Sequence, residues 1–416
     1  MAMEYLGLSD INGPLVAVDG VKGVGFEEMV EMKTATGTRL GRIAALEGER
    51  AVIQVFAGTS GMTLSGTASR FTGSPMRLAL APEIVGRIFN GAGEPIDGLG
   101  PVYAERFEDI NGSAINPVSR SYPRNYIRTG ISSIDSLITL IRGQKLPIFS
   151  GSGMKHNELA VQIARQAKIK DANENNFAIV FAAMGAKNDV AEYFRRSFDE
   201  SGVLQKVVMF LNLSNDPIIE RILTPRCALT AAEYLAFEKG MHVLVIMTDI
   251  TAYCEALREF SSSKGEIPSR KGFPSYMYSD LASIYERAGL IRGKPGSVTL
   301  VPILTMPGDD ISHPIPDLTG YITEGQMVLS RELAQKGPPV SILPSLSRLM
   351  KDGTGEGFTR ADHPDLSNQL FASYSEVASA RSLATVIGED ELSEGDKLSL
   401  KFGNELEKQF ITQGMY

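Results

Sequence analysis

The middle of the chain alternates nearly continuous apolar runs with segments of helical periodicity, from about Lys145 to Pro339. The apolar runs predict strands at Leu146–Phe149, Phe177–Ala183, Val207–Leu213, Val243–Thr248 and Val298–Leu304. The intervening segments predict helices at Glu158–Lys168, Asp189–Glu200, Thr230–Lys239, Thr251–Phe260 and Asp280–Ala288. Strands that are apolar on both faces are typical of parallel sheets covered on both sides. The alternation therefore predicts an α/β domain with a parallel sheet.

The segments on either side of this region have different patterns. Short alternating apolar runs with glycine-containing turns, as at 14–21, 27–32 and 39–56, predict a small β-barrel over residues 1–72. A stretch rich in glycine and proline, about Gly73 to Arg142, then reads as a connecting region that enters the central domain. We place the central domain at 73–347 and a C-terminal helical domain at 348–416, with helices expected at Leu370–Ile387 and Ser393–Ile411.

Composition limits the functional classes that remain. The 416 residues hold 41 Lys plus Arg against 49 Asp plus Glu, a net charge of −8 that disfavours a dedicated duplex nucleic-acid binder. The longest apolar run, Phe177 to Ala186, is too short to cross a bilayer, and the first residues lack the pattern of a signal peptide. Cys227 and Cys254 give neither a disulfide framework nor metal-ligand spacing. We expect a cytosolic protein without a metal site of its own.

The segment after the first apolar run of the central domain, residues 149–158, has the position of a phosphate-binding loop, between a strand and a helix. Functional loops read Gly-x-x-x-x-Gly-Lys-Ser/Thr, because the lysine reaches the terminal phosphates and the hydroxyl holds magnesium. In this alignment Ser150 and Lys155 take the two glycine positions, His156 replaces the lysine and Asn157 replaces the hydroxyl residue. The loop keeps the position of an ATPase loop and lacks its chemistry.

Lys155 does not replace the missing lysine, because it lies one residue before the position that lysine occupies in functional loops. One residue corresponds to a rotation of about 100° around a helix, so we expect its side chain to point away from the phosphates. A Gly-x-Gly before a helix is also compatible with a plain strand-to-helix turn. The candidate residues of this degenerate phosphate loop are Ser150, Gly151, Ser152, Gly153, Lys155, His156 and Asn157.

Two other strand ends bear on hydrolysis. Asp249 ends an apolar strand, where a carboxylate often supports magnesium. Without a loop hydroxyl we favour the alternative that Asp249 caps the following helix. A hydrolytic site also needs a carboxylate after the strand that ends near Ala183, and Ala186 and Lys187 offer none.

A series of motifs in fixed order makes the chain resemble a known family, the non-catalytic B subunits of V/A-type rotary ATPases and ATP synthases. The resemblance covers nearly the whole chain. The motifs lie at 58–62, 109–112, 115–118, 129–135, 142–153, 224–230, 255–259, 285–289 and 313–326.

The resemblance implies a fold with an N-terminal β-barrel, a RecA-like nucleotide-binding domain and a C-terminal helical bundle. It also implies an alternating ring of three catalytic A subunits and three B subunits around a central rotor stalk, with a peripheral stalk and a membrane sector that transports protons or sodium. ATP or ADP with magnesium then lies at the A–B interface, and a degenerate phosphate loop is normal for B. The family usually continues some tens of residues past Tyr416, so we expect a shortened bundle.

Arg348 resembles the residue that the family supplies to the neighbouring catalytic site as an arginine finger. A guanidinium from a second chain offsets charge on the transferred phosphoryl group, and is worth about 10³ to 10⁵ in rate in other systems. From the residues alone we would favour an ion pair between Arg348 and a carboxylate of its own chain, and the family motif reverses that preference.

Two other functions remain as alternatives. An independently active RecA-like export ATPase would need Lys and Ser/Thr at positions 156 and 157, and a hexameric nucleic-acid translocase would need basic stretches with aromatics. We expect His242 and His313 to be structural, because neither has a second ligand at metal spacing. Tyr276 and Tyr278 fit either a subunit interface or packing within the domain.

Overall fold

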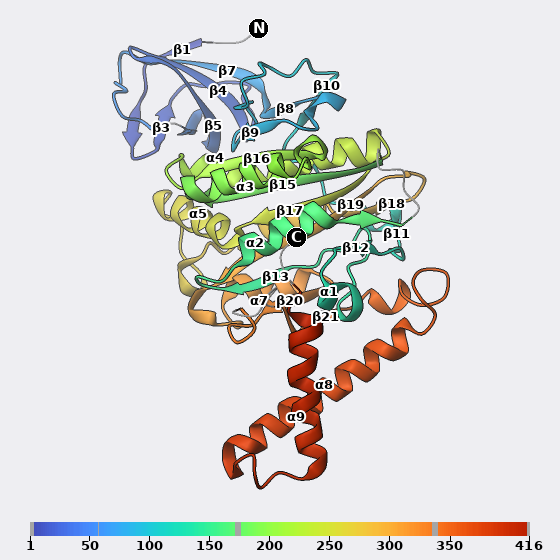
Figure 1. Ribbon diagram of the computed structural model, residues 1–416. Coiled ribbons are helices and arrows are strands. Elements are labelled where there is room, and N and C mark those ends of the chain that lie inside the picture. Colours follow the sequence, from blue (N-terminus) through green and yellow to red (C-terminus); the bar gives the residue numbers. More distant parts are fainter. Residues whose placement is uncertain (1–3, 57, 171–175, 335–339, 414–416) are drawn as a thin grey trace.

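The computed structural model describes residues 4–56, 58–170, 176–334 and 340–413. It has three parts along its length: a β-barrel at the N-terminal end, a central α/β domain, and a helical hairpin at the C-terminal end (Figure 1). This is the predicted fold class, and all three parts are confirmed.

Within the described residues the N-terminal part is a seven-stranded antiparallel sheet in the order β1-β7-β4-β5-β6-β3-β2. Its interior holds alternate apolar residues such as Val30, Ile43 and Ile53, all fully buried. The strands are β1 Glu4–Leu6, β2 Asp10–Asn12, β3 Leu15–Val18, β4 Glu28–Thr34, β5 Gly37–Glu47, β6 Arg50–Val55 and β7 Ala68–Pro75.

The connecting region is more structured than its glycine and proline content indicates. Strand β9 pairs in parallel with β16 and forms one edge of the central sheet, while β8 and β10 form a separate antiparallel pair. The sequence pattern did not reveal these strands, because a three-residue strand leaves too short an apolar run to be recognised. The elements are β8 Arg77–Leu80, β9 Ile88–Asn90, β10 Arg106–Asp109, β11 Arg120–Ser121, β12 Ile127–Arg128 and α1 Ser132–Leu137.

The central sheet runs in the order β21-β20-β13-β19-β17-β15-β16-β9, with β18 and β11 joined to it beside β19. The strands from β20 to β9 are mutually parallel, and β21 and β18 pair antiparallel with their neighbours. The five predicted strands are confirmed. The strands that follow α1 are β13 Ile148–Gly151, β14 Lys168–Ile169, β15 Phe177–Ala186, β16 Val207–Leu213, β17 His242–Thr248, β18 Gly289–Ile291, β19 Ser297–Met306, β20 Gly325–Leu329 and β21 Val340–Ser347. Of these, β14 lies outside the central sheet and pairs with β12.

Helices cover both faces of this sheet. Apolar residues of α1, α2 and α3 pack on one face, and those of α4, α5, α6 and α7 pack on the other. The helices are α2 His156–Gln166, α3 Asn188–Glu200, α4 Ile218–Glu233, α5 Ile250–Ser263, α6 Met277–Tyr285 and α7 Pro314–Ile322.

One helix begins twelve residues earlier than the predicted Thr230, because α4 starts at Ile218 and carries Pro225 in its interior. A proline disfavours the helical conformation of the residue before it, which is why the sequence pattern hid this half of the helix. The helix then continues into a π-helical turn, Tyr234–Glu238.

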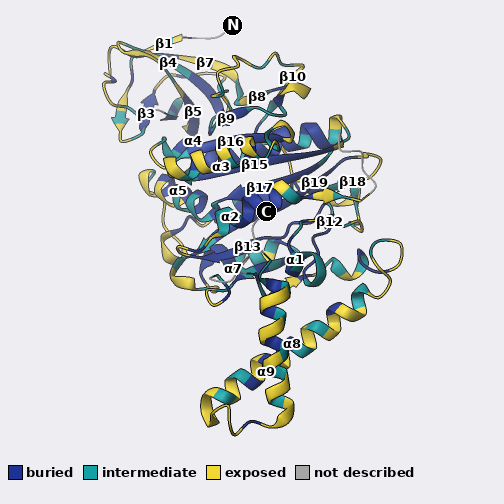
Figure 2. Ribbon diagram, viewed as in Figure 1, coloured by how far each residue is buried: buried dark blue, intermediate teal, exposed yellow. Residues whose placement is uncertain are grey.

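The C-terminal part is a hairpin of α8 His363–Ile387 and α9 Glu394–Leu406, the latter continued by a π-helical turn at Glu407–Ile411. The central sheet is buried almost throughout, whereas much of the hairpin surface is exposed (Figure 2). The hairpin docks on α1, where His363 Nε2 and Ser367 Oγ lie 2.8 and 2.5 Å from the Ser136 carbonyl oxygen.

Candidate functional site

The carboxyl ends of the parallel strands meet at one edge of the central sheet, the place where open α/β sheets bind ligands. The degenerate phosphate loop follows β13, Ala186 ends β15, Asp249 follows β17, and Thr305 lies near the end of β19. The fold thus brings together the loop and two of the positions singled out for hydrolysis.

The degenerate phosphate loop joins β13 directly to the first turn of α2. Gly153 has φ 75°, a left-handed conformation that suits glycine. His156 opens the helix, and its Nδ1 lies 3.0 Å from the Ser150 hydroxyl. Burial lowers the pKa of His156 and outweighs the opposing attraction of Asp249 and Glu158. The position that holds a lysine ammonium in active loops therefore favours a neutral imidazole that faces its own loop.

The two residues beside His156 supply neither the missing lysine ammonium nor the missing hydroxyl of an active loop. Lys155 is exposed at the N-cap of α2. The Asn157 side-chain oxygen accepts a long hydrogen bond of 3.4 Å from the Thr248 hydroxyl, and its amide cannot replace a hydroxyl that binds magnesium.

An ion pair that the sequence analysis missed lies over the loop. Arg331 donates to both carboxylate oxygens of Asp309 at 2.7 and 2.8 Å, and to the Ser152 carbonyl oxygen at 3.0 Å. A side chain at Gly151 would meet the ends of the Asp309 and Arg331 side chains, so this ion pair would have to shift to admit it. No local pattern reveals this pair, because Asp309 and Arg331 are 22 positions apart and flank a helix and a strand.

Asp249 is a helix cap, as predicted. Its carboxylate accepts from the Thr251 backbone amide at 2.8 Å at the start of α5, and from the Thr305 amide at 3.1 Å and hydroxyl at 2.5 Å. The Asp249 carboxylate is thus hydrogen-bonded to three donors of its own chain, as a helix cap is.

Arg348 directly follows β21 and its side chain is exposed. One guanidinium nitrogen donates to the Thr323 carbonyl oxygen at 3.1 Å. Among the residues that the structure describes, no ion pair joins Arg348 to a carboxylate, and no hydrogen bond joins it to the degenerate phosphate loop. In the described part of the chain, no carboxylate forms the ion pair with Arg348 that the alternative requires.

Family models match along most of the chain. They are the ATP synthase alpha/beta family beta-barrel domain at residues 8–73, the nucleotide-binding domain of the same family at 130–347, and the C-terminal domain of V and A type ATP synthase at 352–416.

Individual relatives agree with these models. The chain is 64% identical to the V-type ATP synthase beta chain of Halothermothrix orenii, over 100% of this chain and 90% of that protein. It is also 64% identical to V-type ATP synthase beta chain 2 of Clostridium tetani, over 100% of this chain and 91% of that one. A solved structure of the ATP synthase subunit NeqB from Nanoarcheaum equitans matches with a TM-score of 0.76 and 42% identity, covering 97% of this chain and 94% of the other. The chain belongs to the family of V/A-type ATP synthase B chains.

Membership in the B-chain family confirms the predicted resemblance and makes the chain a subunit of a V/A-type ATP synthase with a nucleotide-binding domain of the alpha/beta type. Among the described residues of this B-family chain, no helix combines the length and apolar character needed to cross a bilayer.

The remaining residues singled out from the sequence have partners outside the loop. His242 Nδ1 is 3.0 Å from the Ser297 hydroxyl, and His313 caps α7 by accepting from Ile315, so both have structural partners. Tyr278 is 43% exposed and its ring contacts that of Tyr321. Burial raises the pKa of Tyr276 to about 12, with a contribution from Glu266.

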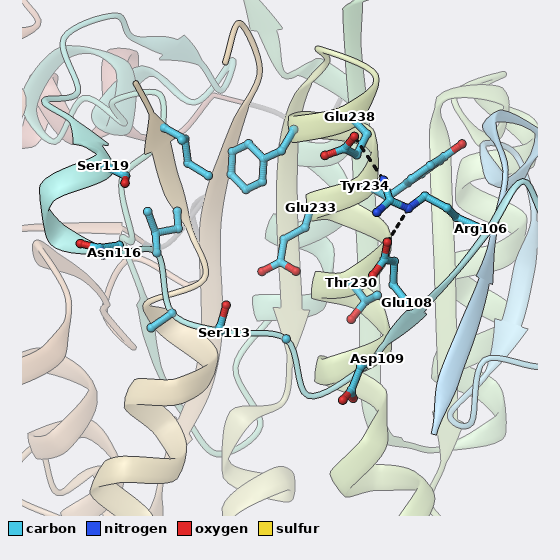
Figure 3. A pocket seen from close by; sticks show the side chains of 15 residues that line it. Arg106, Glu108, Asp109, Ser113, Asn116, Ser119, Thr230, Glu233, Tyr234 and Glu238 are labelled. Atoms are coloured by element: carbon cyan, nitrogen blue, oxygen red, sulfur yellow. Dashed lines mark ion pairs between the residues drawn. The ribbon is translucent and has the colours of Figure 1, made fainter. Parts of the chain in front are cut away.

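A cavity of about 510 Å³ lies between the connecting region and the last turns of α4 (Figure 3). Arg106 spans one side of it and forms ion pairs with Glu108 at 2.5 Å and Glu238 at 3.3 Å. None of the residues predicted for nucleotide or catalysis lines this cavity.

Proposed function

We propose that the chain is the non-catalytic, regulatory B subunit of an alternating A₃B₃ head, and that Arg348 acts as an arginine finger in the neighbouring A subunit's site. The observation that carries the proposal is the exposed guanidinium of Arg348, held by one carbonyl oxygen and available to a second chain. A planar guanidinium offers paired donors for phosphoryl oxygens, and such a group acts most strongly on transition-state charge.

The degenerate phosphate loop supports a non-catalytic role. A half-buried imidazole at His156, whose pKa is lowered, and an amide at Asn157 give no charge for the β- and γ-phosphates and no hydroxyl for magnesium. ATP or ADP with magnesium would therefore be turned over at the A–B interface, with no nucleotide held tightly by this chain alone.

The wider assembly is part of the proposal. The names of the relatives refer to V-type ATP synthases, and we infer that the chain contacts the catalytic A subunit, a central rotor stalk and a peripheral stalk. In that assembly it lies on the cytoplasmic side of the membrane sector, and it helps to couple ATP turnover to proton or sodium transport. The domain limits 1–72, 73–347 and 348–416 form part of this proposal.

A mass measurement with and without the A subunit, combined with an ATPase assay, tests this function. We expect the isolated chain to show no ATPase activity above background and to enter a large alternating ring only when A is added. An isolated chain that hydrolyses ATP with a dependence on His156 would support the rival reading, an independently active export ATPase.

A further inference from the structure

Lys145 is a buried cation between two carboxylates, three residues before the start of β13. The residue is 3% exposed, and its ammonium lies 3.0 Å from Glu286 and 2.7 Å from Glu324. Glu286 also pairs with Arg120 at 2.6 Å. A charge this deeply buried persists only when partners offset its desolvation, so these contacts fix the positions of the groups that make them.

Glu324 connects Lys145 to Arg348. Its carboxylate accepts the Lys145 backbone amide at 2.7 Å, and its own amide donates to the Lys145 carbonyl oxygen at 3.1 Å. Its carbonyl oxygen then accepts the Arg348 backbone amide at 3.0 Å. The preceding residue, Thr323, supplies the carbonyl oxygen that receives the Arg348 guanidinium. Arg348 therefore makes two hydrogen bonds to the Thr323–Glu324 segment, one through its side chain and one through its backbone.

A second set of buried groups holds the residue before Arg348. The Gln144 side-chain amide donates to the Glu324 carbonyl oxygen at 3.1 Å and to the Ser347 hydroxyl at 3.0 Å. Ser347 in turn donates to the Thr139 carbonyl oxygen at 2.9 Å. Gln144 and Thr139 are fully buried, so this network is protected from water. The Arg348 side chain is therefore exposed, whereas the side chains of this network are buried and hydrogen-bonded to one another.

We infer that Lys145 is a positioning residue, which acts through Glu324 to fix the direction in which Arg348 leaves the sheet. This inference rests on the proposed function of Arg348. Glu286 keeps Arg120 when the ammonium is removed, whereas Glu324 loses the cation that it pairs with. The uncompensated Glu324 carboxylate beside Glu286 then displaces the Thr323–Glu324 segment. The Arg348 guanidinium then keeps its charge but is no longer oriented toward the neighbouring catalytic site. This lowers the rate of the chemical step more than the affinity for substrate.

The test uses the reconstituted ring of this chain with its catalytic partner, with ring assembly confirmed by mass. For Lys145→Met we expect kcat to fall by about 10- to 100-fold, with KM changed by no more than about twofold. Glu324→Gln keeps the backbone bonds of Glu324 and removes its charge, and should give a smaller fall in kcat. Lys145→Arg keeps the cation and should recover part of the activity.

The decisive comparison is made in the Arg348→Ala background, where Lys145→Met should lower kcat no further, since the residue on which it acts is gone. A matched control is Glu233→Gln, because Glu233 pairs at 2.6 Å with Arg287, which is equally buried. This control should leave kcat near that of the unmodified ring.

Each outcome decides the inference. Equal losses of kcat from Lys145→Met with and without Arg348 would overturn it. Normal kcat in Lys145→Met, while Arg348→Ala is slow, would overturn it and leave the proposed function standing. Normal kcat in Arg348→Ala would overturn both. If Lys145→Met and Glu324→Gln both fail to assemble while Glu233→Gln assembles, Lys145 is a folding residue and the inference is wrong.

Discussion

The Ser150 hydroxyl and the His156 imidazole lie 3.0 Å apart across the degenerate phosphate loop. This contact fills the space between strand and helix with two side chains of the loop itself. The N-terminus of α2, where active loops bind phosphate, directly follows the loop. Two loop amides have partners within the loop, since Met154 donates to the Gly151 carbonyl oxygen at 3.2 Å and His156 to the Met154 carbonyl oxygen at 2.9 Å.

Replacing Lys155, His156 and Asn157 by Gly, Lys and Thr should therefore create magnesium-ATP binding at this loop without hydrolysis. The new lysine supplies a point charge and the threonine a hydroxyl for magnesium, so we expect a Kd on the order of 1 mM or tighter. Hydrolysis stays absent because Ala186 and Lys187 offer no carboxylate to orient water. Calorimetric titration of the variant ring, with the A-subunit sites blocked, measures the binding.

A matched control replaces only Lys155 by Gly, which changes the loop backbone without adding the lysine or the hydroxyl. It should bind no more nucleotide than the unmodified chain. Absence of binding in the triple variant would mean that the loop backbone cannot accept phosphate, and a regulatory nucleotide role for this domain would be abandoned.

Glu220 gives the stability of the chain a specific pH dependence. Burial raises its pKa to about 7, with further contributions from Asp216 and Glu94. The folded chain keeps a proton on Glu220 that the unfolded chain releases near its usual pKa of 4.5, so stability falls as pH rises from about 4.5 to about 7. Glu220→Gln should raise Tm at pH 8 and leave it unchanged near pH 4.5.

Thermal unfolding at the two pH values measures this difference. The exposed Glu47→Gln serves as the control and should change Tm by the same small amount at both. A Glu220→Gln variant whose Tm change is the same at pH 8 and pH 4.5 would show that this carboxyl does not titrate as described.

The C-terminal hairpin depends on a close approach between Gly403 of α9 and Val377 of α8. A Cβ at Gly403 would meet the Val377 side chain, so Gly403→Ala should destabilise the hairpin by about 1–3 kcal/mol. Gly395→Ala lies on the same helix with only an ordinary contact at 3.8 Å, and should be neutral or stabilising. Hydrogen exchange of α8 and α9 reports the change, and Val377→Ala should partly reverse it. Unchanged exchange in Gly403→Ala would contradict this packing.

The sequence predicted those features that depend on local periodicity. The apolar runs of β15, β16, β17 and β19 follow from burial on both faces, and the position of the phosphate loop follows from the strand and helix beside it. The sequence analysis missed the short strand β9, because three residues are too few to show an alternating apolar pattern. It also missed the first half of α4, because Pro225 interrupts the helical pattern there.

The buried network behind Arg348 could not be predicted in this way. Lys145 and Glu324 are 179 positions apart, and Gln144 and Ser347 are 203 apart. Each residue looks like an ordinary surface side chain in its own segment. Only the pairing of β13 with β20, and of β20 with β21, brings them into contact.

The turnover of a reconstituted ring that carries Arg348→Ala tests the account most directly. With assembly confirmed by mass, we predict that kcat falls by about 10³-fold or more while the ring stays intact, since Arg348 acts on charge that develops only in the transition state. Arg348→Lys should recover little, because an ammonium cannot reproduce the planar fork. An intact Arg348→Ala ring with a kcat near that of the unmodified ring would contradict the assignment of Arg348 as the residue that completes the catalytic site.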